Sequence, residues 1–526
     1  MDALAGCLTR GKVRRALQDL PRTLDETYDR VLRAINESLY AEEALMTLKW
    51  LTFAEEPLRA CQVLELTGIR IDEERFDEDE RLMNPHDILR ICSSLVRISC
   101  SCDEGSTGDE MTEHVHLAHF TVKSYLTSGR ASLPEYRFLY TNCHELLATS
   151  CIVYLLHQSA KPQAETISSV WHRRNDLNDY AMYYWARHVR LAHHYPQRLS
   201  QLVTKLLIEQ PPLWVEWYGI NDRPVRMEGD ETPSHLETTT CTSSDPLWVA
   251  SKEGLEPAVR ALLASATVDV NMAWGNKGNA LQAAATKSHE DVIQLLLEHG
   301  ADVNSHSGYY LGNALQIASF HNHKLLVAKL LASGADPNAE GGRYGTSLQV
   351  ASVCGYTDIA NMLLTSGANV NAKGGRYHTA LQAASLRGSM PIVKLLLSKD
   401  AEVNAQGGRF HTALQAASAK GHHEVVEILL ARGANVNAHG GARMQSAYSL
   451  AMSRGHMRIG QLLVAHGADT GVAIDDVPSL ASSSAPDRCF ATFVQMLQRM
   501  RMKNGPITIA GAENKAHDHQ TSQNSE

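Results

Sequence analysis

Three residues near the start of the chain have the spacing of a phosphate-binding loop. Gly6, Gly11 and Lys12 fit the pattern G-x-x-x-x-G-K, in which backbone N–H groups and the lysine hold phosphates. The next residue of a working loop is Ser or Thr, whose hydroxyl binds magnesium, but Val13 stands there. No buried strand precedes the pattern either. We therefore predict no nucleotide binding and no hydrolysis of ATP or GTP.

A second group, of Cys and His residues between 92 and 119, combines thiols and imidazoles, the donors that zinc prefers. Its spacing matches no standard zinc site, and its alternation suits two ordinary strands with one buried face. We therefore predict that no metal and no cofactor is bound. Because no Ser, Cys and His arrangement indicates a hydrolase, the chain is predicted to have no catalytic site. The members of the group are Cys92, Cys100, Cys102, His114, His116 and His119.

The composition is that of an ordinary globular protein with several cores. Among 526 residues, 44% are hydrophobic, 20% charged and only 6% aromatic, which favours a mainly α fold rather than an all-β fold. Lys and Arg number 49 against 58 Asp and Glu, a net charge of −9, so nucleic acid and anionic membranes are not expected partners. No signal peptide and no long apolar run is present, and the 10 Cys form no framework. An intracellular, cytoplasmic protein is predicted.

One phrase recurs through the second half of the chain. It reads NALQAA at 279, NALQIA at 313, TSLQVA at 346, and TALQAA at 379 and 412. Looser copies, DPLWVA and SAYSLA, place Leu247 and Tyr448 in the slot of its leucine, so the period is 33 or 34 residues. A fixed period of this length is the signature of a repeat architecture.

Each repeat has the start and stop signals of two short helices. Thr346, Thr379 and Thr412 are each followed three residues later by Gln, the pattern of a capping box. Asn279 and Asn313 are equally good N-caps with a Gln at the same distance. A turn residue is predicted to end the first helix at Gly254, Ser288, Asn322, Gly355, Gly388, Gly421 and Gly455. The second helix is predicted to close on a left-handed residue at Gly300, Gly334, Gly367, Gly433 and Gly467, with Asp400 as the exception.

The phrase resembles the signature of ankyrin repeats, T-P-L-H-x-A at a 33-residue period. The resemblance covers residues 245–470, about seven repeats. It implies a solenoid of helix-turn-helix units with projecting β-hairpin fingers, whose units must stack because none can bury its apolar face alone. It also implies protein–protein binding along the concave face that fingers and first helices form.

The predicted fingers carry a row of arginines, each followed by an aromatic residue. They read GGRYG at 341, GGRYH at 374 and GGRFH at 407, and Arg443 continues the row less regularly. Arg and aromatic residues are enriched at binding hot spots, although the aromatics would also pack finger against finger. A spacing of about 8 to 10 Å, that of packed helices, suits an extended acidic segment with Asp, Glu or phosphoserine near every third residue. The candidate partner-binding residues are Arg343, Tyr344, Arg376, Tyr377, Arg409, Phe410 and Arg443.

The first half carries four strings that belong to a second resemblance. The strings are LPRTLDETYDRVLRAI, LKWLTFAEEPLRACQVLEL, ILRICSSLVRIS and VHLAHFTVKSYLTS. Together they resemble the winged-helix and helical region that follows the NACHT domain in fungal NOD-like receptors of the NACHT-ankyrin type. The NACHT domain itself is not in this chain. The resemblance implies a winged-helix-like region at 1–130 and a helical spacer at 131–240, the latter mainly on Tyr180, Tyr184, Trp185 and His188.

The residues of this half predict particular elements. An amphipathic helix is expected from Leu24 to Leu39, two strands at 94–102 and 114–117, and a helix from Phe120 to Leu126. The acidic run 72–80 is expected to be a solvated loop. Residues 471–526 are expected to be a largely disordered tail.

The predicted architecture is mainly α: a winged-helix-like region, a helical spacer and an ankyrin-repeat solenoid. The predicted function is non-catalytic recognition of a protein partner. The resemblance places it in fungal intracellular sensing, self/non-self recognition or signalling. The alternative is a fragment or truncated gene model of a NACHT-type signalling NTPase whose P-loop lies upstream. A third interpretation, a substrate adaptor for a modifying enzyme, depends only on the ambiguous Leu20–Pro21 pair.

Overall fold

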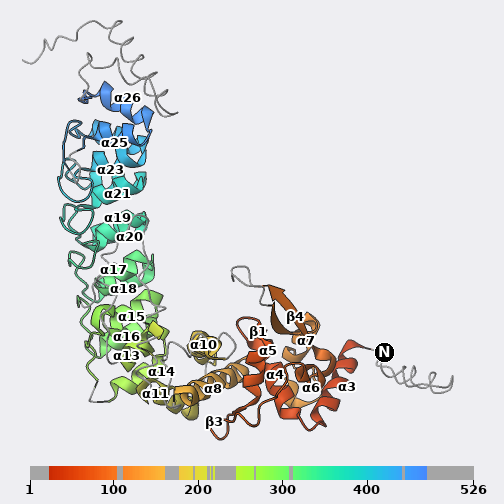
Figure 1. Cartoon of the computed structure of the whole chain (residues 1–526). Helices are drawn as coiled ribbons and strands as arrows, with labels where there is room; N and C mark the ends of the chain where they lie inside the picture. The colour runs from red at the N-terminus through yellow and green to blue at the C-terminus, as the bar shows by residue number, and fades with distance from the viewer. Residues whose placement is uncertain are drawn as a thin grey trace, which may run out of the picture.

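The structure is a computed structural model with helices throughout most of its length. It describes residues 23–102, 111–159, 177–192, 196–209, 214, 217–218, 245–265, 268–306, 312–440 and 445–470. A column of paired helices forms the C-terminal half, and the N-terminal region, which combines helices with a small sheet, lies to one side of the foot of this column (Figure 1).

The first helix of the described chain, α3 (Leu24–Asn36), is the amphipathic helix expected from the sequence, but it is shorter. Its N-cap is Thr23, whose hydroxyl accepts the N–H of Glu26 at 3.1 Å. The helix ends at Asn36, and the chain turns before Leu39, which is therefore 89% exposed. Leu24, in the first turn, is also exposed. The face that reaches the core consists of Tyr28, Leu32 and Ile35.

A small antiparallel sheet with helices on it follows. The sheet order is β1-β5-β4, and the predicted pair of strands and the helix after them are confirmed. Val96 pairs with Leu117 and Ile98 with Val115, so one face of the hairpin is apolar and packs on the core. The elements are α4 (Ala41–Phe53), β1 (Leu58–Arg59), α5 (Ala60–Thr67), β2 (Ile69–Arg70), β3 (Arg75–Phe76), α6 (Asp87–Ile91), η1 (Ser93–Leu95), β4 (Val96–Cys102), β5 (Met111–Leu117), α7 (Phe120–Thr127) and η2 (Pro134–Tyr136).

Three helices connect this region to the repeats: α8 (Tyr140–Ser159), α10 (Asn178–Leu191) and α11 (Gln197–Glu209). Helices α8 and α10 pack on each other, and α11 packs on the first repeat. An aromatic seam closes the junction, with ring centroids 5.5 Å apart for Trp185 and Trp214 and 5.1 Å for Tyr218 and Trp248. These helices therefore cover the N-terminal end of the solenoid, whose first repeat would otherwise expose its apolar face.

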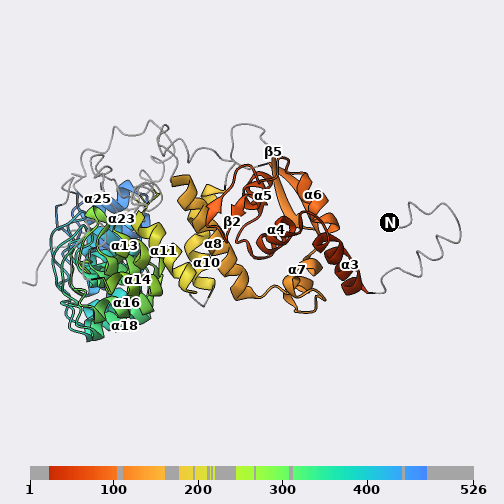
Figure 2. The same ribbon diagram turned by 90° about the horizontal axis from the view of Figure 1, so that it is seen from below.

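The solenoid contains seven helix pairs within the described residues. Their finger loops gather on one side of the stacked helices (Figure 2). The pairs are α13 (Pro246–Glu253) with α14 (Glu256–Leu263), α15 (Ala280–Lys287) with α16 (Glu290–Glu298), α17 (Ala314–Phe320) with α18 (Lys324–Ala332), α19 (Ser347–Cys354) with α20 (Thr357–Thr365), α21 (Ala380–Arg387) with α22 (Met390–Leu397), α23 (Ala413–Lys420) with α24 (His423–Ala431), and α25 (Ala447–Ser453) with α26 (Met457–Ala465). A short 3-10 helix, η3 (Gly275–Lys277), precedes α15.

The predicted helix caps are present, with one difference. Asn279, Asn313 and Thr346 form complete capping boxes with the Gln three residues on. Thr379 and Thr412 accept the N–H of their Gln, at 3.3 and 3.2 Å, but the reciprocal bond to the cap N–H is absent in these two described repeats. The cap N–H groups bond instead to the carbonyls two residues earlier, at 2.9 and 2.8 Å, because the finger turns back tightly there.

The left-handed positions predicted after the second helices are confirmed, and the predicted turn residues after the first helices are left-handed as well. All seven turn residues after the first helices have positive φ, including Ser288 at 56° and Asn322 at 60°. The five closing glycines have φ between 80° and 90°, and Asp400 adopts the same conformation at 60°. The side chain of Asp400 is exposed, and a Cβ on any of the five glycines would meet nothing within 4 Å. The strain at Asp400 is therefore confined to its backbone.

Two series of amides connect each repeat to the next. The Nε2 of Gln382 donates to the carbonyls of Ala405 and His411, both at 2.9 Å, and the other repeat glutamines act in the same way. In the loops that follow the second helices, Asn371 accepts the N–H of Glu402 at 2.7 Å and donates to the carbonyl of Asp400 at 3.1 Å. The same pair of bonds recurs at Asn271, Asn304, Asn338, Asn404 and Asn437.

Candidate functional site

The candidate binding surface is the row of finger tips at 341–345, 374–378 and 407–411. Each finger closes on itself through an antiparallel bridge, such as the one between Gly374 and His378. Neighbouring fingers are also bonded to each other at their arginines. The N–H of Arg376 donates to the carbonyl of Arg343 at 3.0 Å, and that of Arg409 to the carbonyl of Arg376 at 3.4 Å. The three arginines therefore form one continuous row.

The backbone spacing of this row differs from the expected one. A direct bond between backbone groups holds two chain segments about 5 Å apart, whereas packed helices predicted about 8 to 10 Å. The backbone of the fingers is therefore closer together at these positions than packed helices are, and the spacing of the guanidinium groups stays a prediction.

The aromatic neighbours of the arginines have different positions. Tyr344 and Tyr377 are 1% and 7% exposed, and their rings stack on each other with centroids 6.1 Å apart and an interplanar angle of 11°. Phe320 continues the stack at 6.1 Å from Tyr344. With Val350, Val353 and Ala383, these rings form an apolar cluster separate from the main core. The tyrosines thus join the fingers to the first helices, the packing role considered above.

Phe410 and the arginines are more accessible. Phe410 is half-buried, and the guanidinium of Arg409 lies over its ring, 5.6 Å from the centroid. Arg409 is exposed, while Arg343 and Arg376 are half-buried. Arg443 lies outside the described residues. The arginines and Phe410 are therefore the described members of the predicted set that a partner can reach.

Two histidines in the fingers were not predicted as site residues from the sequence. His378 and His411 have φ of 69° and 67°, in the slot where an earlier finger has Gly345 at 89°. Positive φ is uncommon for a residue with a side chain. The ring of His378 covers Gly407 of the next finger, where an added Cβ would lie 2.7 Å from it. The sequence signal that could have indicated them is the histidine that follows the aromatic residue in GGRYH and GGRFH.

The Cys and His group does not gather at one place. Cys92 is buried in the core, where burial raises the pKa of its thiol to about 12. Cys100 is exposed on β4, and His119 caps α7 by accepting the N–H of Thr121. His114 and His116 lie on one face of β5. Across the described ranges, no cluster of three or more His, Cys, Asp or Glu is arranged to hold a metal.

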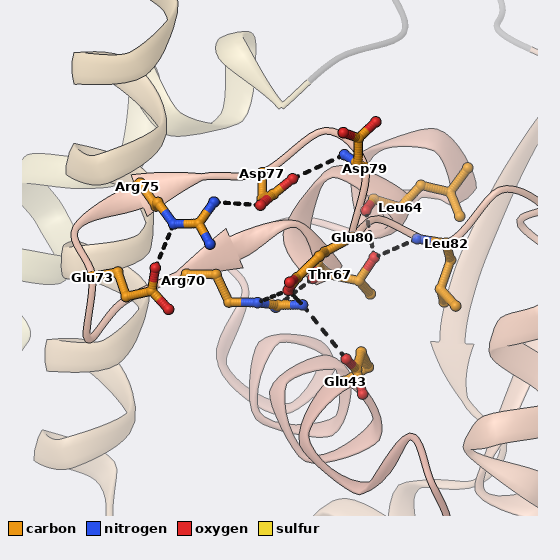
Figure 3. A network of polar contacts seen from close by, with 10 residues as sticks. All are labelled: Glu43, Leu64, Thr67, Arg70, Glu73, Arg75, Asp77, Asp79, Glu80 and Leu82. Atoms are coloured by element: carbon orange, nitrogen blue, oxygen red, sulfur yellow. Dashed lines mark hydrogen bonds and ion pairs between the residues drawn. The ribbon is translucent and has the colours of Figure 1, made fainter.

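The acidic run 72–80 is largely exposed, as expected for a solvated loop, but Arg75 and Phe76 within it form strand β3. Residues 71–74 form the turn of the β2–β3 hairpin, and arginines pair with several of the acids (Figure 3). Arg75 lies between Glu73 and Asp77, and its hydrogen bond lowers the pKa of the Asp77 carboxyl. Arg70 pairs with Glu80 and, at 3.7 Å, with Glu43 of α4.

The same hairpin is bonded to the helices that lead to the repeats. Arg198 of α11 pairs with Glu74 at 3.2 Å and Asp72 at 3.5 Å, and it donates to the carbonyl of Ile71. Phe76 packs on Tyr154 of α8, with ring centroids 5.2 Å apart. The hairpin therefore attaches the N-terminal region to α8 and α11, and much of its negative charge is neutralised within the chain.

A buried polar chain crosses the helices before the repeats. The N–H of Glu55 donates to the hydroxyl of Tyr180 at 3.0 Å, and that hydroxyl lies 2.9 Å from Nε2 of His188. Nδ1 of His188 in turn lies 2.9 Å from Nδ1 of His144. Burial, followed by the nearby His144 and Arg187, lowers the pKa of His188 to about 3, so its ring is neutral. This chain positions α8 against α10 and has no access to a substrate.

Comparison with known proteins identifies the repeats. A family model described as ankyrin repeats in three copies matches residues 233–307 and 348–440. The chain contains ankyrin repeats. A fold of this kind is typically non-enzymatic and implies protein partners. Within the described residues, none of the helices has the length and apolar character needed to cross a membrane.

Two proteins give the comparison more detail. The azaphilone pigments biosynthesis cluster protein L of Monascus ruber is 29% identical over 300 residues, which cover 55% of this chain and 61% of that relative. The alignment thus spans about three fifths of the relative's length. The human ASB11 ankyrin repeat domain is 27% identical, with 43% of this chain and 99% of that chain covered and a TM-score of 0.37.

The remaining sequence predictions fall outside the described residues. These are the phosphate-loop-like string at 6–12 and the tail at 471–526.

Proposed function

We propose that this chain is a non-catalytic recognition protein whose ankyrin solenoid binds an acidic, extended segment of another protein on its concave face. The observation that carries the proposal is the finger row Arg343, Arg376 and Arg409, which neighbouring fingers hold in line through backbone hydrogen bonds. Guanidinium groups form strong charge-assisted bonds with carboxylates and phosphates. Arg443 of the next finger and Phe410 belong to the same proposed surface.

The first half of the chain supports a second part of the proposal. A winged-helix-like region is supported by the order of its elements, α4, β1, α5, α6, β4 and β5, and by the sheet order β1-β5-β4. The resemblance to NACHT-associated regions implies the same kind of region. Helices α8, α10 and α11 then act as the spacer before the repeats. With this arrangement we place the protein inside the cell, in the cytoplasm, in a recognition or signalling role. The Monascus relative is consistent with a fungal setting.

A pull-down followed by an affinity measurement tests the proposal. The triple variant R343A/R376A/R409A should keep the helical circular-dichroism signal and bind the captured partner at least about tenfold more weakly, or 1.4 kcal/mol. A matched control is K394A/K399A/R458A, which removes three exposed cations from the second-helix side of the solenoid. Equal affinities for the two variants would contradict the proposal, since the loss would then come from net charge alone.

A further inference from the structure

The last repeat exposes two positions that the six earlier repeats of the described solenoid keep buried. Counted from the leucine of the recurring phrase, the second residue onward is at most 5% exposed in those six repeats, and the fourth is 0% exposed. In α25, Leu450 and Met452 occupy these positions and are only half-buried. The earlier residues at the fourth position are Ser251, Ala285, Ser319, Ser352, Ser385 and Ser418.

These positions are buried in the earlier repeats because the next first helix packs on them. Helix α21 packs on α23, and α23 packs on α25. Helices α25 and α26 end the described column (Figure 1), so no described first helix follows α25. We call Leu450, Met452 and the half-buried Ser449 the end face. It extends to α26, because an added Cβ at Gly460 would lie 2.6 Å from the sulfur of Met452.

The residue types of the end face do not suit another ankyrin repeat. A Ser or Ala at the fourth position lets the next helix approach closely in the earlier repeats, whereas Met452 is much larger. The Gln that joins five earlier repeats to the next finger is replaced by Ser449. Its hydroxyl donates to the carbonyl of Ser446 at 3.0 Å, within its own helix. A neighbour of another kind is therefore expected on the end face.

The opposite end of the solenoid shows what such a neighbour does. There α11 packs on the first repeat, so the apolar face of that repeat is covered by a helix that is not part of an ankyrin unit. Repeat proteins need a cap at each end, since a terminal unit otherwise leaves its apolar face in water.

The C-terminal tail contains one segment with the pattern of an amphipathic helix. Apolar residues recur there at the spacing of one helix face. Asp487 is a suitable N-cap, and Gly505 with Pro506 provides a stop signal. Thr492 and Gln495 fall on the opposite, polar side. The apolar face consists of Phe490, Phe493, Val494, Leu497 and Met500.

The chain between α26 and this segment is long enough for the segment to reach the end face. The described chain ends at Thr470, shortly after α26 ends at Ala465. Residues 471–487 can span up to about 55 Å when extended, whereas packed helices lie only about 8 to 10 Å apart. A tether of this kind gives the segment a high effective concentration at its own end face, which favours it over a second copy of the chain.

We propose that residues 488–503 form a helix that packs its apolar face on the end face and caps the C-terminal end of the solenoid. The inference goes beyond the proposed function, because it concerns what stabilises the last repeats rather than what the fingers bind. Arg499, Arg501 and Lys503 lie in the last turn of this helix, where cations favour the helix dipole.

Hydrogen exchange of the full chain tests the cap. The variant F493D/L497D places two acids in the apolar face of the segment, and the control T492D/Q495D places two acids on its polar side. In F493D/L497D the amides of α25 and α26 should exchange at least about tenfold faster than in the control, since burying one large apolar side chain already stabilises by more than this ratio. Helices α15 to α18 should exchange equally in both variants.

A reciprocal variant tests the other side of the contact. Leu450→Ala introduces the residue that α23 has at the same position, Ala416, so the repeat itself should tolerate it. The amides of 488–503 should exchange faster in this variant, although no residue of the segment is changed. Exchange in 488–503 equal to that of the unchanged chain would overturn the packing of the segment on Leu450.

The remaining outcomes identify another occupant. Equal exchange of α25 and α26 in F493D/L497D and T492D/Q495D would overturn the cap. Phe493→benzoylphenylalanine should crosslink on illumination to 447–465 of the same chain, whereas crosslinks between isotopically heavy and light chains would assign the end face to a second copy and overturn it. If phosphatidylserine vesicles bind the unchanged chain but not F493D/L497D, and α25 and α26 exchange equally in both variants, the segment is a membrane anchor and the cap is overturned.

Discussion

The glutamines that join consecutive repeats lead to a quantitative prediction at Gln382. Its side chain is 4% exposed, and Nε2 donates to the carbonyls of Ala405 and His411 in the next repeat, both at 2.9 Å. Gln382→Ala removes both bonds and leaves the shielded carbonyl of Ala405 with no donor, while the carbonyl of His411 still accepts the N–H of Gly407 at 2.9 Å. A lost hydrogen bond costs about 1 kcal/mol, and an unsatisfied buried group about 1 to 3 kcal/mol. We expect the variant to lose about 2 to 4 kcal/mol.

A matched control separates this effect from the loss of any glutamine. Gln294 is exposed on α16 and bonds only one turn along its own helix, to Glu298 at 2.8 Å. Gln294→Ala should cost less than about 0.5 kcal/mol, since such surface pairs contribute a few tenths.

Two measurements on the full chain check the prediction. Urea unfolding followed by circular dichroism gives the change in stability, and hydrogen exchange locates it. The amides of the finger at 407–411 should exchange faster in Gln382→Ala, because the finger loses its attachment to α21. The reasoning is refuted if Gln382→Ala and Gln294→Ala have equal unfolding midpoints and equal exchange in this finger.

Three further predictions concern single side chains. Asp400→Gly should be neutral or stabilise by about 0.5 to 1 kcal/mol, because φ is 60° there, and a loss above about 1 kcal/mol in urea unfolding would contradict this. Burial raises the pKa of Asp245 from 3.8 to about 6, so the folded state holds this proton more tightly and stability falls as pH rises through this window. Asp245→Asn should therefore raise the Tm at pH 7.5 but not near pH 4. An equal change in Tm at both pH values would contradict this prediction. Arg198→Ala should speed hydrogen exchange at 69–76 while costing only about 0.5 to 1 kcal/mol, and unchanged exchange there would show that the ion pairs do not hold the hairpin.

The repeats could be predicted from the sequence because each element has a local signal. The Thr or Asn caps, the left-handed turn residues and the 33-residue period all act within a few residues of one another, so the helices and even the φ of Asp400 followed from them. The β4–β5 hairpin was predicted for the same reason, from the alternation that places Val96 and Val115 on one face.

Features that depend on distant residues could not be predicted. The pairing of Arg198 with Glu74 joins residues 124 positions apart, and no local pattern in the acidic run indicates its partner. The burial of Tyr344 depends on Phe320 and Tyr377 in the neighbouring repeats. For the candidate site, the sequence indicated the row of arginines, while the backbone bonds that set its spacing came only from the structure.

The central claim is that the finger row contacts the partner, and hydrogen exchange of the full chain with and without the captured partner tests it most directly. We predict slower exchange in the bound state at 341–346, 374–379 and 407–412, with little change at the second helices α20, α22 and α24. Protection confined to the second helices or to residues 23–209, with the fingers unchanged, would contradict the account.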